Sequence, residues 1–267
     1  MAGFFYHKRI WITGASSGIG ESLAIALARQ GAHLILSSRN ALELERVAAA
    51  CKEAGAPETI VQPLDLEQYI ELPGIADQLI RKVGKIDVLI NNGGISQRAR
   101  ALDTTLDVDK KLMDVNYMGT VALTKAVLPH MLLHELGHIV VVSSLVGIIG
   151  SPLRSSYSAA KHALHGFFDS LRAELAETPI RVTIICPGFI RTNVSKNALT
   201  GAGKPQGKMD EATGKGMHPD VVARKILRAV ENGREEAYFG GREVLAIYLK
   251  RFFPGWFSRI LRRAKVT

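Results

Sequence analysis

The chain has 267 residues, 47% of them hydrophobic, which suits one α/β domain or two small ones and argues against disorder. Its formal net charge is +9, but segment 242–267 alone carries seven basic residues and one acid, so the remainder carries only +3 and does not predict a nucleic-acid surface. The two cysteines, Cys51 and Cys186, lie far apart and predict neither a disulfide framework nor a metal site.

Apolar runs alternate with helical patterns along the chain. Predicted strands occupy 9–13, 33–38, 59–63, 86–91, 138–144, 181–186 and, as a last short one, 235–240. Predicted helices occupy 19–30, 41–54, about 67–83, about 107–133, 156–177 and 218–233. Most strand runs are continuously apolar, as expected for strands covered on both faces. The alternation predicts a single α/β domain, with a doubly wound parallel sheet of about seven strands flanked by helices on both faces.

The pattern changes after Pro187. Residues 188–217 are rich in Gly, Lys, Asn and Thr and show weak periodicity, which is typical of a functional loop or a lid. We therefore predict one domain over 1–240, with 188–217 as its lid. A basic amphipathic extension follows over 241–267.

Three glycines mark the junction between the first strand and the first helix. In "TGASSGIG", Gly14, Gly18 and Gly20 allow a tight turn and the close approach of backbone N–H groups to a pyrophosphate. The helix dipole favours the same negative charge. The alternative is a turn that binds no ligand, but five further strand signals follow this first βα unit, which favours a dinucleotide site.

The second predicted strand ends beside the expected adenosine ribose. Ser37, Ser38, Arg39 and Asn40 stand where a carboxylate would accept the 2′-hydroxyl of NAD(H). No acid is there to repel a 2′-phosphate, and Arg39 can pair with one, so we predict NADP(H). The alternative is that Arg39 is an exposed residue at a helix start and that NAD(H) binds.

Two further segments follow strands at the same sheet edge. Asp65 is expected to cap the next helix, to accept a bond from the adenine amino group, or both. "NNGG" (91–94) is either a plain turn or a backbone surface beside the adenine ribose.

Tyr157 and Lys161 stand four residues apart in the helical segment "SSYSAAKHA" (155–163) and so project from one helix face. A cation near a phenol lowers its pKa from about 10, so we expect Lys161 to lower the pKa of Tyr157. Tyr157 would then act as general acid or base. Ser144 is expected to donate a hydrogen bond to the substrate oxygen, and Asn116 to hold a water between Lys161 and solvent.

These segments together resemble the short-chain dehydrogenase/reductase family over about 1–240: "TGASSGIG", "NNGG", Asn116, Ser144, "YSAAK" and "PGFIRTN". The resemblance implies a Rossmann-type sheet, a nicotinamide cofactor and a catalytic tetrad. The tetrad residues are Asn116, Ser144, Tyr157 and Lys161, with Ser144 fitting the family spacing better than Ser143. The cofactor would contact Gly14, Ser16, Ser17, Gly18, Ile19, Gly20, Ser38, Arg39, Asn40, Asp65, Leu66, Asn92, Gly93, Gly94, Tyr157, Lys161, Pro187, Gly188, Ile190 and Thr192. Gly93 replaces the usual alanine, which we expect to be tolerated.

A closer likeness links the chain to the dehydrogenase/reductase member 7 and 7B group, through "DTTLDVDKKLMDVNYMGTVALTKAVLP", "RAELAE" and "ATGKGMHPDVVARKIL". That likeness implies a hydrophobic carbonyl or alcohol substrate and a homodimer or homotetramer, with the helices near 107–133 and 156–177 as interfaces.

Arg98 and Arg154 are interpreted as solvated surface residues. The alternative is that the two arginines flank the mouth of the active site and attract an acidic group.

Location and activity leave three interpretations. The start of the chain lacks the apolar region of a secretory signal, and no stretch reaches the ~18 apolar residues of a membrane span, so we expect a cytoplasmic protein. Aromatic and basic residues over 242–267 suit contact with a membrane surface, the alternative being a helix packed on the body or on a second subunit.

Three activities remain open. The chain is expected to be a carbonyl reductase or alcohol dehydrogenase, a lipid carbonyl reductase at a membrane surface, or a non-catalytic dinucleotide sensor or scaffold.

Overall fold

The computed structural model describes residues 3–262. Its core is one seven-stranded sheet in the order β3-β2-β1-β4-β5-β6-β7, and every neighbouring pair is parallel. The strands are β1 Arg9–Thr13, β2 His33–Ser37, β3 Thr59–Val61, β4 Val88–Asn91, β5 Gly137–Val142, β6 Ile180–Pro187 and β7 Glu236–Phe239. The predicted doubly wound, Rossmann-type α/β fold is confirmed.

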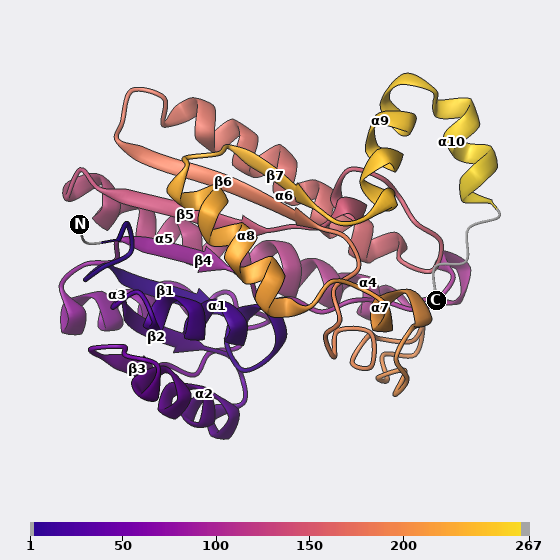
Figure 1. Cartoon of the computed structure of the whole chain (residues 1–267). Helices are drawn as coiled ribbons and strands as arrows, with labels where there is room; N and C mark the ends of the chain where they lie inside the picture. The colour runs from indigo at the N-terminus through magenta and orange to yellow at the C-terminus, as the bar shows by residue number, and fades with distance from the viewer. Residues whose placement is uncertain (1–2, 263–267) are drawn as a thin grey trace.

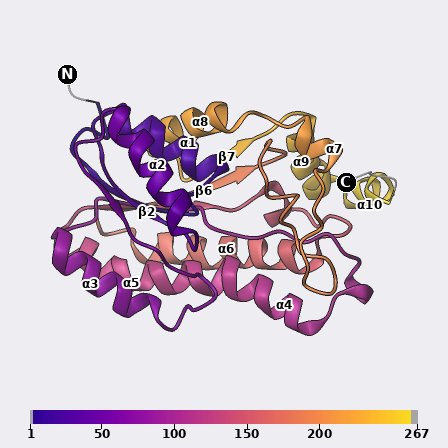
Figure 2. The same ribbon diagram turned by 90° about the horizontal axis from the view of Figure 1, so that it is seen from below.

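Helices cover both faces of the sheet (Figures 1 and 2). Those on one face are α1 Gly18–Ala28, α2 Ala41–Glu53 and α8 Pro219–Glu231. Those on the other are α3 Leu72–Val83, α4 Leu106–Met113, α5 Gly119–Leu133 and α6 Ser155–Glu174. Two apolar cores result, one on each face, because the central strands are buried on both sides: all six residues of β5 are buried.

Two expected helices differ in the structure. The helix expected over 107–133 is divided into α4 and α5 by a π-helical turn over Asp114–Met118, which contains Asn116. Such turns occur frequently at functional sites, and one extra residue in a turn leaves no signal in the apolar periodicity. The helix expected from about residue 67 begins at Leu72, because Asp65 Oδ1 accepts the Glu67 N–H at 3.0 Å and closes a turn instead of capping that helix.

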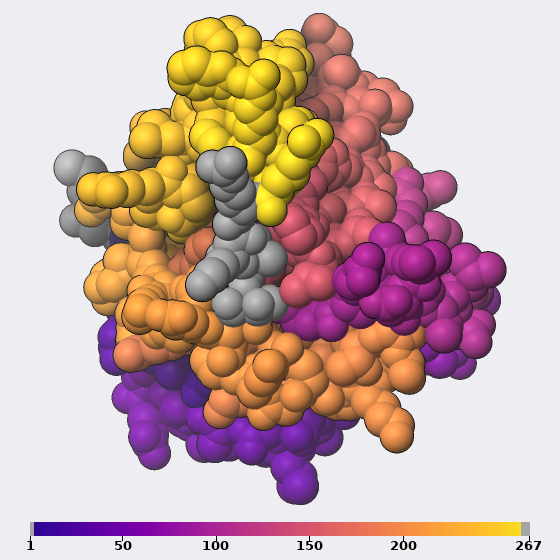
Figure 3. All heavy atoms as spheres, turned by 90° about the vertical axis from the view of Figure 1, so that its right-hand side faces the viewer, coloured from indigo at the N-terminus to yellow at the C-terminus, as the bar shows by residue number. Residues whose placement is uncertain are grey.

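The segment 188–217 is held to the body at several points. Leu199 pairs with Gln97 in the β4–α4 loop, and the Gly201 carbonyl oxygen accepts the Thr105 N–H at 3.1 Å. Within the segment, Ile190 pairs with Met217, and the short helix α7 Glu211–Gly214 lies near its end. The C-terminal extension forms α9 Leu245–Phe252 and α10 Pro254–Leu261, at the same end of the molecule as α7 (Figure 1). Figure 3 looks onto that end, with α9 and α10 in yellow and the segment 188–217 in orange on one face. Arg263 and Lys265 of the basic extension lie outside the described residues.

Candidate active site

One cavity of about 1490 Å³ lies at the carboxyl ends of the strands. This is where open parallel sheets bind ligands, next to the switch in strand order between β1 and β4. Among the predicted site residues, Gly20 alone does not line the cavity. The structure therefore brings together residues that lie up to 178 positions apart in sequence, from Gly14 to Thr192.

The glycine-rich turn after β1 has the shape that a pyrophosphate requires. Gly14 and Gly18 have φ angles of +65° and +60°, in the left-handed region that favours glycine. Helix α1 begins at Gly18, which lines the cavity together with Ile19, and Ser17 makes no side-chain hydrogen bond to cap the helix. The first N–H groups of α1 are therefore not taken by this side chain, and a helix N-terminus at a cavity suits an anion. Gly20 has a packing role instead, since a Cβ there would collide with the Gly14 carbonyl oxygen.

The "NNGG" segment is bound to the turn. Asn92 Nδ2 donates to the carbonyl oxygen of Thr13 at 3.0 Å, and Thr13 Oγ1 accepts the N–H groups of Asn92 and Gly93 at 3.0 and 2.9 Å. A Cβ on Gly93 would lie 2.6 Å from Leu66 Cδ1. Leu66 thus fills the space of the usual alanine methyl group, which explains how this chain accommodates glycine there.

The edge of the cavity beyond β2 carries polar and basic groups. Ser38 and Arg39 line it, and Asn40 Oδ1 caps α2 by accepting the Glu43 N–H at 3.2 Å. Glu43 also lines the cavity, but its carboxylate pairs with Arg46 at 2.8 Å. The residues around Arg39 are therefore placed to meet the adenosine end of a nicotinamide dinucleotide.

The four predicted catalytic residues meet at the centre of the cavity. Ser144 follows β5, Tyr157 and Lys161 lie in the first turns of α6, and Asn116 lies in the π-helical turn. Ser144 hydrogen-bonds the Tyr157 phenol and also donates to the Pro187 carbonyl oxygen at 3.3 Å. Ser143, the alternative at sequence level, donates instead to the carbonyl oxygen of Lys161 at 3.2 Å.

Asn116 is fully buried and rigidly held. Its Nδ2 donates to the carbonyl oxygens of Ile95 and Leu112 at 3.0 and 2.9 Å, and its Oδ1 accepts the Ile95 N–H at 3.0 Å. A Cβ on Gly94 would lie 2.5 Å from Asn116 Oδ1, so only glycine lets the backbone after β4 lie this close to the Asn116 side chain. The water expected at Asn116 stays a prediction.

The electrostatics of the phenol differ from those expected. Burial raises the pKa of Tyr157, and the guanidinium groups of Arg98 and Arg154, with the Ser144 hydrogen bond, act in the opposite direction. Lys161 is not among these influences: its Nζ lies 5.9 Å from the ring centroid and donates to the Val142 carbonyl oxygen at 2.8 Å. Burial lowers the pKa of Lys161 to about 8.

The interpretation of Arg98 and Arg154 as solvated surface is wrong. Both side chains are only 5% exposed, line the cavity and face Asp210 of the segment 188–217. The polar run "ISQRAR" after "NNGG" was the available signal, but a sequence does not show that a distant carboxylate folds over two arginines.

Sequence reasoning also missed Gln97. Its side chain is fully buried, and its Oε1 accepts the N–H groups of Ser156 and Tyr157 at 3.0 and 3.3 Å. Gln97 thus satisfies the start of α6, where Arg154 provides no side-chain cap. Its amide nitrogen donates to Thr104 Oγ1 at 2.9 Å and to Ser155 Oγ at 3.3 Å.

The C-terminal helices complete the cavity wall. Side chains of α9 and α10 that line it include Leu249, Phe257 and Ile260. Lys250 Nζ donates to the Ile148 carbonyl oxygen at 2.6 Å and ties α9 to the loop after β5. The extension is therefore part of the substrate side of the site.

Comparisons with known proteins agree with this geometry. Residues 8–202 match the short chain dehydrogenase family. Relatives named as members 7 and 7B of the dehydrogenase/reductase SDR family match nearly the whole chain, as the sequence predicted. Human member 7 is 44% identical over 253 residues, covering 92% of this chain and 74% of its own.

Two solved structures share the fold. An SDR protein from Burkholderia phymatum, in complex with NAD, has a TM-score of 0.84 at 24% identity and covers 94% of this chain and 95% of its own. An alcohol dehydrogenase from Thermococcus sibiricus, complexed with 5-hydroxy-NADP, has a TM-score of 0.75 at 28% identity, with coverages of 88% and 96%. The family match covers 195 of the 267 residues, and the site has the geometry described above. The chain therefore belongs to the short-chain dehydrogenase/reductase family, whose members are oxidoreductases that act on CH–OH or C=O groups with a nicotinamide cofactor.

Proposed function

We propose that the protein is an NADP(H)-dependent oxidoreductase of apolar carbonyl compounds and secondary alcohols. The observation that carries the cofactor preference is Arg39, exposed at the cavity edge after β2 with Ser38 and Asn40 beside it. A guanidinium group there pairs with a 2′-phosphate, whereas no carboxylate among residues 37–40 offers a bond to a 2′-hydroxyl.

The tetrad supports proton handling at the substrate oxygen. When bound, the cofactor supplies or accepts the hydride at the substrate carbon. Tyr157 Oη delivers a proton to the oxygen during reduction and removes it during oxidation. Ser144 Oγ, which hydrogen-bonds the phenol, is placed to donate to the same oxygen as its charge develops. Lys161, buried at the cavity wall, supplies a positive charge when protonated.

The apolar wall supports a hydrophobic substrate. Leu145 and Ile149 line the cavity from the loop after β5, and Leu199 lines it from the segment 188–217. Leu249, Phe257 and Ile260 line it from the C-terminal helices. Each large side chain that a ligand shields from water contributes about 1.5–3 kcal/mol, which favours an extended apolar molecule over a small polar one.

The same helices support action at a membrane surface. The protein would then be a peripheral membrane protein of the cytoplasm. Tyr248, Phe252, Phe253 and Trp256 are between 52% and 70% exposed, and basic residues stand beside them on α9 and α10. Ala246, Leu249 and Ile260 line both the main cavity and a hollow of about 430 Å³ between the two helices. The hollow beside the exposed aromatic side chains therefore adjoins the cavity that holds the tetrad. No helix among residues 3–262 is long and apolar enough to span a bilayer.

A spectrophotometric screen tests the proposal. Absorbance at 340 nm is followed with NADPH or NADH against a panel of apolar ketones, with Tyr157→Phe as the matched variant. We expect turnover with NADPH that Tyr157→Phe abolishes, while the variant still binds cofactor. Absence of turnover across the panel, with cofactor binding intact, would favour a dinucleotide sensor instead.

A further inference from the structure

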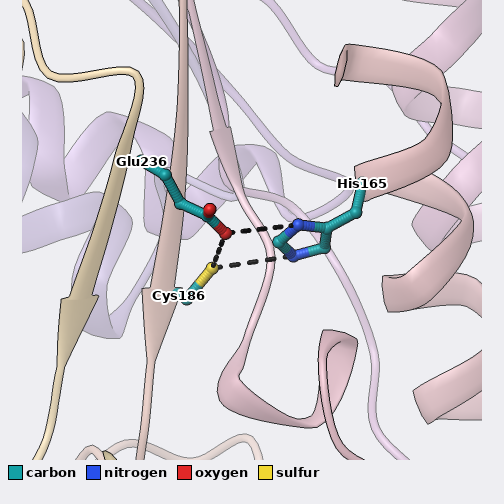
Figure 4. Close-up of side chains that lie close together, drawn as sticks. All are labelled: His165, Cys186 and Glu236. Atoms are coloured by element: carbon teal, nitrogen blue, oxygen red, sulfur yellow. Dashed lines mark hydrogen bonds and ion pairs between the residues drawn. The ribbon is translucent and has the colours of Figure 1, made fainter. Parts of the chain in front are cut away.

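Behind the tetrad, three side chains from three elements form a compact cluster (Figure 4). His165 comes from α6, Cys186 from β6 and Glu236 from β7. Cys186 Sγ lies 3.6 Å from His165 Nε2 and 3.6 Å from Glu236 Oε1. His165 Nδ1 lies 3.3 Å from the same oxygen. All the ligand atoms of the cluster lie within 4.8 Å of one another.

The three donor types suit one class of ion. A thiolate, an imidazole and a carboxylate together prefer a divalent cation of borderline softness, above all Zn²⁺. Zinc bonds of about 2.3 Å to sulfur and about 2.0–2.2 Å to nitrogen or oxygen place tetrahedral neighbours about 3.3–3.6 Å apart. The two separations from the Cys186 sulfur, to His165 Nε2 and to Glu236 Oε1, already have such values.

One adjustment is needed, because the imidazole presents Nε2 to the thiol and Nδ1 to the carboxylate, as Figure 4 shows. An ion binds only one of the two nitrogens. The Glu236 side chain is 33% exposed and can swing its carboxylate toward Nε2. The Ser143 hydroxyl, 3.1 Å from Nε2, contacts the nitrogen from the active-site side.

Burial and access differ among the three groups. Cys186 is fully buried, and burial raises the pKa of its thiol, so an arriving cation would displace a proton. Glu236 opens the cluster to solvent and leaves room for water as a further ligand. None of the three residues lines the main cavity, so the cluster is separate from the substrate and cofactor site.

We propose that His165, Cys186 and Glu236 form a zinc-binding site that ties α6 to β6 and β7. The sequence predicted no metal site, since the three residues are 21 and 50 positions apart and show no ligand spacing. His165 follows Lys161 by one helical turn, and Cys186 precedes Pro187, whose carbonyl oxygen holds Ser144. A bound ion would therefore brace the elements that carry the tetrad.

Cobalt(II) titration of full-length, untagged, chelator-treated protein tests the proposal. We expect one equivalent of Co²⁺ to produce a near-ultraviolet thiolate-to-cobalt band and the visible bands of tetrahedral cobalt, both removed by Zn²⁺. Cys186→Ser should lose the thiolate band. Cys51→Ser, which alters the other buried thiol, should keep it. Zn²⁺ should also raise the Tm of the wild type by mass action.

Glu236→Gln gives a second reading that does not depend on the buried thiol. Its side chain is partly exposed, so the variant should fold, and it should bind Co²⁺ at least tenfold more weakly than the wild type. The proposal is overturned if the wild type shows no thiolate band, if the band survives in Cys186→Ser, or if Glu236→Gln binds as tightly as the wild type.

Discussion

Arg98 Nε donates to Asp210 Oδ2 at 2.7 Å, and Arg98 Nη2 forms an ion pair with the same oxygen at 2.5 Å. Burial alone would raise the pKa of Asp210, but hydrogen bonds from Arg98 and Gln206 outweigh it and hold that pKa below its usual value. The carboxylate therefore stays ionised at neutral pH. It ties the segment 188–217 to the loop that follows β4.

We expect Asp210→Asn to change the pH dependence of catalysis. The Arg98 and Arg154 guanidinium groups already act to lower the pKa of Tyr157, and Asp210 offsets part of their charge. Without the carboxylate, the basic form of Tyr157 gains stability, so the acidic limb of kcat/KM for alcohol oxidation should move to lower pH, by about one unit. The measurement is a pH–rate profile.

Glu211→Gln is the matched control, because this neighbouring carboxylate is 74% exposed and pairs only with Lys215 among the described residues. Its profile should equal that of the wild type. If the acidic limb of the Asp210→Asn profile stays at the wild-type pH while the Tm falls, Asp210 stabilises the fold and does not influence the pKa of Tyr157.

Gln97→Ala should lower kcat without weakening cofactor binding. The change leaves two buried N–H groups at the start of α6 without their acceptor, at a cost of about 1–3 kcal/mol, and frees the helix turn that carries Tyr157. Gln97 itself does not line the cavity in which the cofactor would bind. Stopped-flow kinetics and NADPH titration well below the Tm separate the two quantities.

Gln62→Ala, in the loop after β3, serves as the control for Gln97 and should leave kcat unchanged. A Gln97→Ala enzyme that turns over at the wild-type rate would show that α6 places Tyr157 without this cap.

The strands, their parallel orientation and a site at the glycine turn after the first strand were predictable, because continuous apolar runs and glycine turns are local signals. The contacts of Gln97, Arg98 and Asp210 were not, since 112 positions separate the last two and no pattern links them. The effect of Lys161 on Tyr157 was inferred from helix spacing alone. The structure shows that side chains four residues apart share a face yet end in different surroundings, one at the Val142 carbonyl and the other at Ser144.

Lys161→Met should alter both turnover and the pH dependence of stability. Burial holds the pKa of Lys161 near 8 in the folded, cofactor-free protein, against about 10.4 in an unfolded chain. Between these two pKa values the unfolded state binds more protons than the folded state. Burying the ammonium group lowers the free energy of unfolding, and this cost is fully present below pH 8. It disappears as the pH rises, by up to ~1.4 kcal/mol per pH unit. Turnover should fall by about 10²–10⁴-fold.

The measurement is the free energy of unfolding of both proteins from pH 7 to pH 10. The variant should be relatively most stable at pH 7 and lose that advantage toward pH 10. Lys125→Met, on the exposed side of α5, should differ from the wild type by a constant amount. A constant difference for Lys161→Met as well would contradict the lowered pKa.

Arg39→Ala should raise the KM for NADPH at least tenfold and leave the KM for NADH nearly unchanged. A charge-assisted bond to the 2′-phosphate contributes about 1.5–3 kcal/mol, and each 1.4 kcal/mol is about tenfold in affinity. Steady-state kinetics with the two cofactors measure the ratio, and Arg81→Ala on α3 is the control. Equal losses for both cofactors would count against the NADP(H) preference.

Replacing Phe253 and Trp256 by serine should release the protein from anionic lipid vesicles. Both side chains are more than 60% exposed and stand at the junction of α9 and α10, next to Lys250 and Arg251. Aromatic rings beside basic charge bind the headgroup region of a bilayer, and salt screens the charged part of that attraction. Co-sedimentation with phosphatidylserine-containing vesicles should therefore fall in the double variant and in high salt. Serine at Leu133 and Leu136, two exposed leucines just before β5 at the opposite edge of the sheet, should leave it intact. Equal sedimentation of all three proteins would remove the membrane from the proposed function.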